Sequence, residues 1–332
     1  MKIAVVILNW NGKELLKQFL PKILHYSSIE YTDIYVADNA STDDSINYIK
    51  QHFSTVKIIQ NRENGGYAKG YNEALQQVDA EIFALVNSDI EVTDNWLEPI
   101  YKHFKENPNI HIAQPKILDY KQKEYFEYAG AGGGFVDQLG YPYCRGRIFD
   151  TLEKDDGQYN DTQPIFWASG ACLFIRSSVF HELEGFDTDY FAHQEEIDLC
   201  WRAYNKGYKT VYIGASTVYH IGGATLNKSH WKKTFFNFRN SLYNLLKNAP
   251  GNYHWLIFQR LVLDGIAGVK FLLNGQFIHT IAIIKAHFSF YAHFFKMLNK
   301  RRDLGEKRKD YYRVKNIVWN YYFKKKKKYS EL

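Results

Sequence analysis

The first third of this chain alternates short apolar runs with stretches of helical patterning, and this alternation constrains the fold most. The apolar runs read KIAVVIL, DIYVAD, VKIIQ and EIFALV, and amphipathic segments follow them near residues 13–25, from 42, from 67 and after 93. Runs that are apolar on both faces are typical of strands in a sheet covered by helices on both sides. Four strand–helix units in succession predict an α/β fold, in which a mostly parallel, Rossmann-like sheet is flanked by helices.

The remainder of the chain does not continue this strand–helix alternation. Residues 110–165 are rich in Gly and Tyr and predict loops and hairpins. A further strand should lead into a helix capped by Ser177 or Ser178, and EEIDLCWRAYNKG predicts a helix that ends at Gly207 before the strand KTVYI. After His220 we expect long apolar helices with scattered basic residues. The predicted units are a domain over 1–223, with halves of about 1–117 and 118–223, and a helical extension over 224–332.

Polar clusters follow each of the four strands, at the edge where ligands bind in open α/β sheets. They read NWNG, DNASTDDS, NRENGGYAKGYNEAL and NSD. Asp38 can accept a hydrogen bond from a base imide, with Asn39 or Ser41 beside it. Asn64, Gly65 and Gly66 place flexible backbone at a helix N-terminus, which favours a diphosphate, and Asn72 could point at the same ligand.

Each cluster alone has a simpler interpretation. Asp38 is then a turn residue, and the Asn-Gly-Gly sequence is a tight loop. Asp89 follows a buried strand and is a candidate ligand for a hard cation. Four clusters at four successive strand ends favour a shared site over four unrelated loops.

The residues of these segments, and their order along the chain, resemble glycosyltransferase family 2, whose members have the GT-A fold. The resemblance covers about residues 3–245 and is carried by VVILNWNG, DNASTDDS, NGGYAKGYNEAL, GFDTDYFAHQEEIDLCWRAYNKGYKTVY and YHIGGAT. It implies inverting transfer of a sugar from a dTDP-, UDP- or GDP-linked donor to a saccharide or lipid-linked glycan acceptor. The polysaccharide and rhamnosyltransferase branch of the family is the one expected, although the donor base, the sugar and the acceptor stay open.

The resemblance also implies roles for individual residues. The metal motif of the family falls on Asn87-Ser88-Asp89, so an amide replaces its first carboxylate and Asp89 should hold Mg²⁺ or Mn²⁺. His220 matches a histidine that completes the metal site, although an ordinary core histidine is the competing interpretation. The full set of expected donor-binding residues is Asn9, Asn11, Asp38, Asn39, Ser41, Asn64, Gly65, Gly66, Asn72, Asn87, Ser88 and Asp89.

The paired acids of the family fall on Glu195 and Glu196, which makes Glu196 the expected catalytic base. The predicted helix start should lower the pKa of Glu196 and keep it ionised at neutral pH. Glu195 is expected to contact the acceptor, with Trp167 and Gly170 beside it. Trp167 could stack on a sugar, and packing in the core is the alternative. Asp198 and Arg202 are spaced as a helix-surface ion pair.

The C-terminal region is strongly basic. After residue 296 there are 13 Lys and Arg against 4 Asp and Glu, and five of the lysines are consecutive, 324–328. No apolar run reaches the ~20 residues of a membrane-spanning helix. We expect interfacial amphipathic helices and a basic tail that binds an anionic membrane surface. A helical subdomain packed on the core, or a homodimer contact, is the alternative.

The cellular location follows from two further observations. Three cysteines without paired spacing suit a reducing compartment, and a strand begins directly at the N-terminus. We therefore expect a cytoplasmic protein peripherally associated with the inner face of the cell membrane, with no nucleic-acid partner. A dinucleotide-dependent oxidoreductase would need a Gly-rich turn after the first strand, where NWNG stands. A non-catalytic nucleotide- or nucleic-acid-binding protein that uses the basic tail remains the alternative function.

Overall fold

The computed structural model describes residues 1–27, 29–222 and 231–332. Its first half contains four parallel strands, in the order β4-β1-β2-β3. Three of them are largely buried, whereas β3 lies at the edge of the sheet and is mostly exposed. The four strands are β1 (Ile3–Asn9), β2 (Thr32–Asp38), β3 (Lys57–Gln60) and β4 (Ile82–Asn87). The helices between and after them are α1 (Lys13–Ser27), α2 (Ser45–His52), α3 (Gly66–Leu75) and α4 (Glu98–Glu106).

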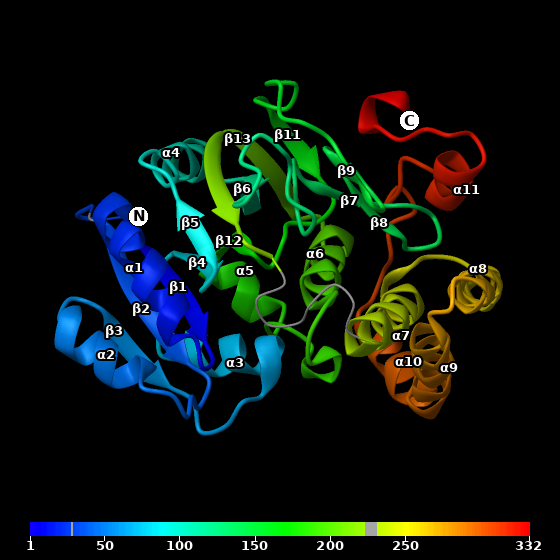
Figure 1. Cartoon of the computed structure of the whole chain (residues 1–332), viewed down its shortest axis with the longest axis horizontal. Coiled ribbons are helices and arrows are strands. Elements are labelled where there is room, and N and C mark those ends of the chain that lie inside the picture. The colour runs from blue at the N-terminus through cyan, green and yellow to red at the C-terminus, as the bar shows by residue number, and fades with distance from the viewer. Residues whose placement is uncertain (28, 223–230) are drawn as a thin grey trace.

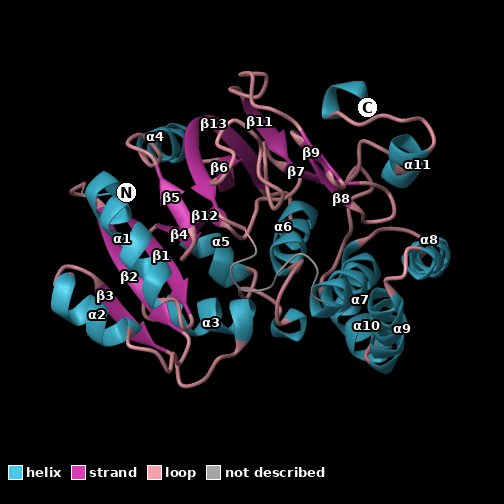
Figure 2. Ribbon diagram, in the orientation of Figure 1, coloured by secondary structure: helices cyan, strands magenta, loops and turns pink. Residues whose placement is uncertain are grey.

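The two faces of these strands carry separate apolar cores. Ile3, Val5 and Ile7 of β1 pack with side chains from α1, α2 and α4, whereas Ala4 and Val6 pack with side chains from α3. Alternation along a strand sends successive side chains to opposite faces, so an entirely apolar run is buried twice. The predicted α/β layering is confirmed, and Figure 2 shows the strands running between the helices.

The second half of the sheet mixes strand directions. Strand β12 (Cys172–Arg176) runs antiparallel between β4 and β6 (Ile110–Asp119), and β13 (Lys209–His220) runs parallel to β6. The edge strands β11 (Thr162–Ile165) and β5 (Ile90–Val92) pair antiparallel with β13. The sheet therefore has nine strands, in the order β11-β13-β6-β12-β4-β1-β2-β3 with β5 beside β13.

Strand β6 lies where the sequence predicted only loops and hairpins, so that prediction was wrong for residues 110–119. Its polar centre concealed it, because buried Gln114 and Lys116 interrupt the apolar pattern. Both side chains find partners: Gln114 Nε2 donates to the Gly130 carbonyl at 3.0 Å, and Lys116 Nζ lies 2.7 Å from Asp155 Oδ2. Buried polar groups that are paired in this way can occupy a central strand.

The predicted hairpins form a small second sheet. It is antiparallel and consists of β7 (Gly134–Val136), β8 (Pro142–Cys144), β9 (Arg147–Ile148) and β10 (Thr151–Leu152). The ring of Trp167 covers Gly134 so closely that a Cβ there would lie 2.1 Å from the indole, and any larger residue would displace it.

Two shorter helices and a turn complete the first 220 residues. They are α5 (Ser177–Glu182), the 3₁₀ turn η1 (Thr188–Tyr190) and α6 (Glu195–Asn205). The predicted serine cap of α5 was wrong: Arg176 occupies the N-cap position, and the Ser177 hydroxyl donates to the Glu81 carbonyl instead. Helix α6 ends as predicted, because Gly207 adopts φ +86° just beyond it.

The C-terminal region is helical. It comprises α7 (Trp231–Asn248), α8 (Tyr253–Leu273), α9 (Phe277–Ala292), α10 (Phe294–Asp303), α11 (Ile317–Tyr322) and the turn η2 (Tyr329–Glu331). Helix α7 contacts α6 on one side and α8, α9 and α10 on the other (Figure 1). The predicted domain boundary at 223/224, with the Gly-Ala-Thr end of the YHIGGAT motif, lies outside the described residues. Within the described helices, none combines the length and apolarity needed to cross a membrane.

The chain after α10 packs on the small sheet. Tyr311, Ile317 and Tyr321 are buried, and the Ile317 N–H donates to Asp137 Oδ2 at 2.9 Å. The Tyr329 ring stacks on Phe135 with centroids 5.4 Å apart. The five consecutive lysines therefore belong to a segment that is anchored before and after them.

Candidate active site

The ends of β1 and β2 bring the first two polar clusters together. Asn9 and Asp38 are paired in register, and Asn9 Nδ2 donates to Asp38 Oδ1 at 3.0 Å and to Ser41 Oγ at 3.1 Å. Asp38 Oδ2 accepts from the Ser41 N–H at 3.0 Å. Asn11 Oδ1 accepts from the Thr42 N–H at 2.7 Å, which ties the two loops again. Asp38 is only 1% exposed, so in this structure it fixes the loops at the rim of the site.

The third cluster is locked to the second. Asn39 Nδ2 donates to Asn64 Oδ1 and to the Gly66 carbonyl, both at 3.0 Å, and Asn64 Oδ1 also accepts from the Gly66 N–H. Gly66 has φ +78°, and a Cβ there would lie 2.5 Å from the Phe191 carbonyl oxygen. Glycine is required at 66 for both reasons, and Gly65 precedes it as the N-cap of α3.

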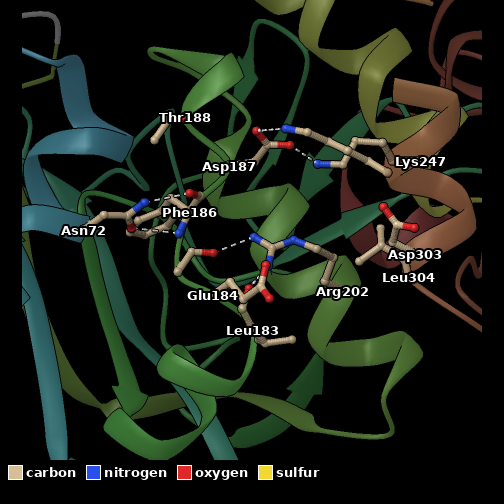
Figure 3. A pocket seen from close by; sticks show the side chains of 12 residues that line it. Asn72, Leu183, Glu184, Phe186, Asp187, Thr188, Arg202, Lys247, Asp303 and Leu304 are labelled. Carbon is tan, nitrogen blue, oxygen red and sulfur yellow. Dashed lines mark hydrogen bonds and ion pairs between the residues drawn. The ribbon is translucent and has the colours of Figure 1, made fainter. Parts of the chain in front are cut away.

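Asn72 lies elsewhere, contrary to the prediction that it points at the donor. Its Nδ2 donates to the Phe186 carbonyl at 2.8 Å, and its Oδ1 accepts from the Phe186 N–H at 2.9 Å. Figure 3 shows this clasp at one side of a pocket of about 350 Å³ whose other side carries Arg202 and Lys247. Asn72 lies in the second turn of α3, where its side chain is directed toward the loop before α6.

The fourth cluster contains the candidate cation site. Asn87 ends β4 and Ser88 follows it in the turn; both are half-buried, and Asp89 is buried. His220, at the end of β13, places Nε2 3.1 Å from Asp89 Oδ1 and Nδ1 3.4 Å from Glu127 Oε1. The sequence prediction joined Asp89 to His220 correctly but missed Glu127, whose only sequence signal is its place just before a Gly-rich run.

In Asp89, Glu127 and His220, opposite charges stabilise each other. Burial alone would lower the pKa of His220, but Glu127 and Asp89 outweigh it and raise the pKa to about 10. Burial likewise opposes ionisation of Glu127, but His220 and the Ala129 N–H hold its pKa below the ordinary value. Without a cation, a protonated histidine thus balances two buried carboxylates.

These residues fit a divalent cation. No group of three or more His, Cys, Asp or Glu side chains surrounds one point within the described residues. Asp89 and His220 nevertheless present an oxygen and a nitrogen 3.1 Å apart, and Glu127 lies on the other ring nitrogen. A carboxylate behind a ligating imidazole is the usual second partner of such a histidine.

The paired acids begin α6. Glu195 is buried and Glu196 half-buried, and the Oε2 atom of each is enclosed with no hydrogen-bond partner among the described residues. Burial raises the pKa of Glu196 to about 7, against opposing backbone hydrogen bonds. Burial and then the charge of Glu196 raise the pKa of Glu195 well above its ordinary value. The expectation that the helix start keeps Glu196 fully ionised was wrong, because desolvation exceeds the dipole effect.

Tyr67 connects the acids to the donor loop. Its N–H donates to the Phe191 carbonyl at 3.1 Å, and its hydroxyl donates to the Gly170 carbonyl at 2.7 Å. Burial and then nearby charges, including Glu195 and Glu196, raise the pKa of Tyr67 well above its ordinary value. Gly170 is therefore linked to the acid pair through Tyr67. Trp167, in contrast, is buried, and its indole N–H donates to the Phe135 carbonyl at 2.9 Å, so the core-packing alternative is the one observed.

The segment just before α6 has an unusual backbone. Phe191, His193 and Gln194 have φ of 61°, 67° and 73°, a region that costs non-glycine residues free energy. Asn240 of α7 holds it there, since its Nδ2 lies 3.1, 3.0 and 2.7 Å from the carbonyl oxygens of Tyr190, Ala192 and His193. The left-handed residues turn the chain so that Glu195 and Glu196 start the helix at the site.

Helix α7 makes further contacts with one stripe of its surface. Asn244 Nδ2 donates to Gln194 Oε1 at 3.2 Å, and Asn248 Nδ2 donates to Asp198 Oδ1 at 2.8 Å. Arg202 Nε donates to Asp198 Oδ2 at 2.8 Å, and both side chains are buried. Asp198 and Arg202 thus form a buried ion pair within α6, so their predicted place on the helix surface was wrong.

Comparisons with known proteins agree with this geometry. A model described as Glycosyl transferase family 2 matches residues 4–183, more than half of the chain. An N-acetylglucosaminyl-diphospho-decaprenol L-rhamnosyltransferase of Mycobacterium tuberculosis is 24% identical over 66% of this chain and 75% of its own length. The rhamnosyltransferase WbbL of Escherichia coli is 24% identical over 70% of this chain and 88% of its own.

Solved structures with a similar fold are known. GalNAc-T7, solved with UDP, GalNAc and Mn²⁺, superposes with a TM-score of 0.66 at 15% identity over 93% of this chain, which spans 55% of that protein. The mannosyltransferase PcManGT of Pyrobaculum calidifontis, in complex with GDP-Man and Mn²⁺, superposes with a TM-score of 0.52 at 14% identity over 91% of this chain and 84% of its own. At this identity the likeness concerns the fold, and it confirms the predicted GT-A type.

Proposed function

The chain belongs to glycosyltransferase family 2, and on that premise we propose that it transfers a hexose or deoxyhexose with inversion to a saccharide or lipid-linked glycan acceptor of a cell-surface polysaccharide. The observation that carries the proposal is a contact between the loop that begins α3 and the segment that leads to the paired acids. Gly66 and Tyr67 contact Phe191, which lies four residues before Glu195. Family membership favours catalysis over the non-catalytic alternative.

The acceptor chemistry follows from the acids. With a pKa of about 7, Glu196 is partly ionised at neutral pH and can take the proton of an acceptor hydroxyl. The hydroxyl oxygen then forms a bond to the anomeric carbon, while the bond from that carbon to the diphosphate oxygen breaks and the nucleoside diphosphate leaves. Burial raises the pKa of Glu195 well above its ordinary value, so a protonated Glu195 is suited to donate a hydrogen bond to the acceptor.

The donor side would be held by the strand-end loops. The Asn64–Gly66 loop offers backbone at the N-terminus of α3, where a diphosphate is favoured. Asp89 and His220 would hold Mg²⁺ or Mn²⁺, with Glu127 orienting His220. When bound, such a cation stabilises the charge of the departing diphosphate.

The relatives support, without deciding, a substrate class. Two of them are named as rhamnosyltransferases, and one name specifies a polyprenyl diphosphate-linked acceptor. We propose a lipid-linked acceptor for this chain and, with it, peripheral association with the inner face of the cell membrane. The basic segment 324–328 is one candidate contact with anionic headgroups.

A panel of nucleotide sugars tests the proposal. The cognate donor with Mn²⁺ should raise the melting temperature, since ligand at a hundredfold its Kd stabilises by about 3 kcal/mol. Asp89→Asn should remove the Mn²⁺-dependent part, whereas Asp94→Ala, at an exposed position of the next loop, should keep it. Unchanged donor binding and turnover after chelation would show the cation assignment to be wrong, and no response to any nucleotide sugar would count against the proposed function.

A further inference from the structure

Helices α8 and α9 pack side by side and carry large apolar side chains on their outer surface. Phe258, Val262 and Ile266 of α8 and Phe277, Ile284 and Phe288 of α9 represent this surface, which we name the α8–α9 face. Spacings of four or seven residues, about one or two helical turns, keep them on one side of each helix. Ile266 is 60% exposed and Phe288 is 72% exposed. Soluble monomers rarely expose apolar patches of this extent unless a partner covers them.

The charges of the face have one sign. Lys270 and Lys285 are the only exposed charged side chains within α8 and α9, both of which the structure describes completely. The chain has no Asp or Glu between Asp264 and Asp303, and Asp264 itself is buried against Arg260 at 2.8 Å. The surface is therefore apolar with isolated positive charges and no exposed acid.

A groove opens within the face. It has a volume of about 360 Å³ and runs between Ile257, Phe258 and Leu261 of α8 and Phe290 and Tyr291 of α9. Phe294 and His254 complete its lining, which contains no Asp, Glu, Lys or Arg. Such a groove suits a hydrocarbon chain, which needs no hydrogen bonds.

Aromatic side chains lie at the border of the face. Lys270 Nζ, at the end of α8, lies 3.4 Å from the Tyr322 hydroxyl of α11. On α11 and just beyond it, Trp319 and Phe323 stack with centroids 4.2 Å apart, and both are more than half exposed. Aromatic rings beside lysines are typical of the boundary between headgroups and acyl chains.

We propose that the α8–α9 face lies on the surface of a phospholipid bilayer that contains anionic headgroups. The apolar side chains enter the outer acyl region, the groove between α8 and α9 takes an acyl chain, and Lys270 and Lys285 extend to the headgroups. Helices in this position lie in the plane of the membrane and do not cross it. This contact is separate from the lysines of 324–328.

A second copy of the chain fits the face less well. A symmetric dimer places the same surface on both sides of the contact. Lys270 and Lys285 would then enter an apolar interface beside their own copies, with no exposed carboxylate on α8 or α9 to pair with them. Like charges placed together in this way destabilise an interface, whereas headgroup phosphates neutralise them.

Co-sedimentation of the full-length protein with vesicles tests the proposal without any donor present. Vesicles of equimolar phosphatidylglycerol and phosphatidylcholine should bind the wild type, and Ile266→Glu with Phe288→Glu should weaken binding by about tenfold or more. Gln51→Glu with Gln77→Glu adds the same charge at exposed positions of the donor half and should leave binding unchanged. Lys270→Gln with Lys285→Gln should weaken binding to the mixed vesicles and leave the weaker binding to pure phosphatidylcholine as it is.

Two further measurements decide the alternatives. Donor hydrolysis by the Ile266→Glu, Phe288→Glu variant should equal that of the wild type, so loss of vesicle binding is distinguished from loss of the active site. Ile266→Ser with Phe288→Ser is the second variant if the first does not fold. Equal vesicle binding by either folded variant and the wild type overturns the proposal. So does light scattering that shows a wild-type dimer, dissociated by the variant, with no vesicle binding by either protein.

Discussion

Glu196 combines a position at a helix start with a carboxyl group that burial keeps partly protonated. Replacement by Gln keeps its size and removes its ability to take a proton. Glu196→Gln should lower kcat by about 10²–10⁴ at saturating donor, with donor affinity near that of the wild type. Glu195→Gln is the matched control on the same turn and should affect acceptor KM more than kcat. If Glu195→Gln loses turnover and Glu196→Gln keeps it, the base is the preceding residue.

The same carboxyl group sets the pH dependence. Because the ionised form of Glu196 is the active one and its pKa in the free enzyme is about 7, kcat/KM should rise about tenfold per pH unit below pH 7 and level off above it. A kcat/KM profile for the acceptor that is flat between pH 5 and 8 would contradict this assignment.

Stability should change in the opposite direction. The pKa of Glu196 is higher in the folded protein than its ordinary value of 4.5, so the folded state binds the proton more tightly. The protonated Glu196 therefore contributes its full stabilisation below about pH 4.5, and this contribution is lost as the pH rises through 7. Glu196→Gln lacks this loss, and its Tm should exceed that of the wild type at pH 8, with a smaller difference at pH 5. Thermal melts of both proteins at the two pH values check the sign.

At the scale of elements, helix α7 positions the acid-bearing segment. Asn240 Nδ2 donates to carbonyl groups of the segment that contains the left-handed residues. Asn240→Ala removes the donor from the Ala192 and His193 carbonyls, whereas the Tyr190 carbonyl keeps the Ala192 N–H, and the change should cost about 1–3 kcal/mol of stability. The kcat should fall while donor affinity changes little, because the donor loops do not contact Asn240. Asn237→Ala, one turn earlier on α7, is the control and should resemble the wild type in both measurements.

The elements that sequence predicted are those with a local signal. Strand β1 was visible because Ile3, Val5 and Ile7 alternate with other apolar residues, so that both faces are buried. Strand β6 was not, because Gln114 and Lys116 are satisfied by distant partners that no local pattern reveals.

The residues of the candidate site, too, were predicted where they have a local sequence signal and missed where they do not. Residues directly after strands, such as Asp38 and Asp89, were predicted because the ends of parallel strands meet at one edge. Glu127 and Asn240 were missed, since each acts through a contact across more than forty residues of chain. Asn72 was wrongly assigned because its rotation about α3 depends on packing that the spacing alone does not determine.

For the whole molecule, the C-terminal segment is part of the fold as well as a source of charge. Removal of residues 304–332 takes away buried Tyr311, Ile317 and Tyr321 and should lower the free energy of unfolding by on the order of 2 kcal/mol for each. Lys324→Gln, Lys325→Gln and Lys328→Gln change exposed side chains only and should leave Tm unchanged. This triple variant, and not the truncation, measures the electrostatic contribution of the segment to vesicle binding, which should be lost in high salt. A truncated protein as stable as the wild type would show that the segment does not contribute to the fold.

The stripe of contacts along α7 limits how this chain can vary in length. Asn240, Asn244 and Asn248 follow one another at the interval of about one helical turn, and each meets a different part of the loop and of α6. A single residue inserted between Asn240 and Asn244 would rotate every later position by ~100° and advance it by ~1.5 Å. Either the loop or Asp198 would then lose its partner. We therefore expect insertions to be tolerated at the turn between α7 and α8 but not within α7. The length of α7 between Asn240 and Asn248 must match the distance between the loop and Asp198 of α6.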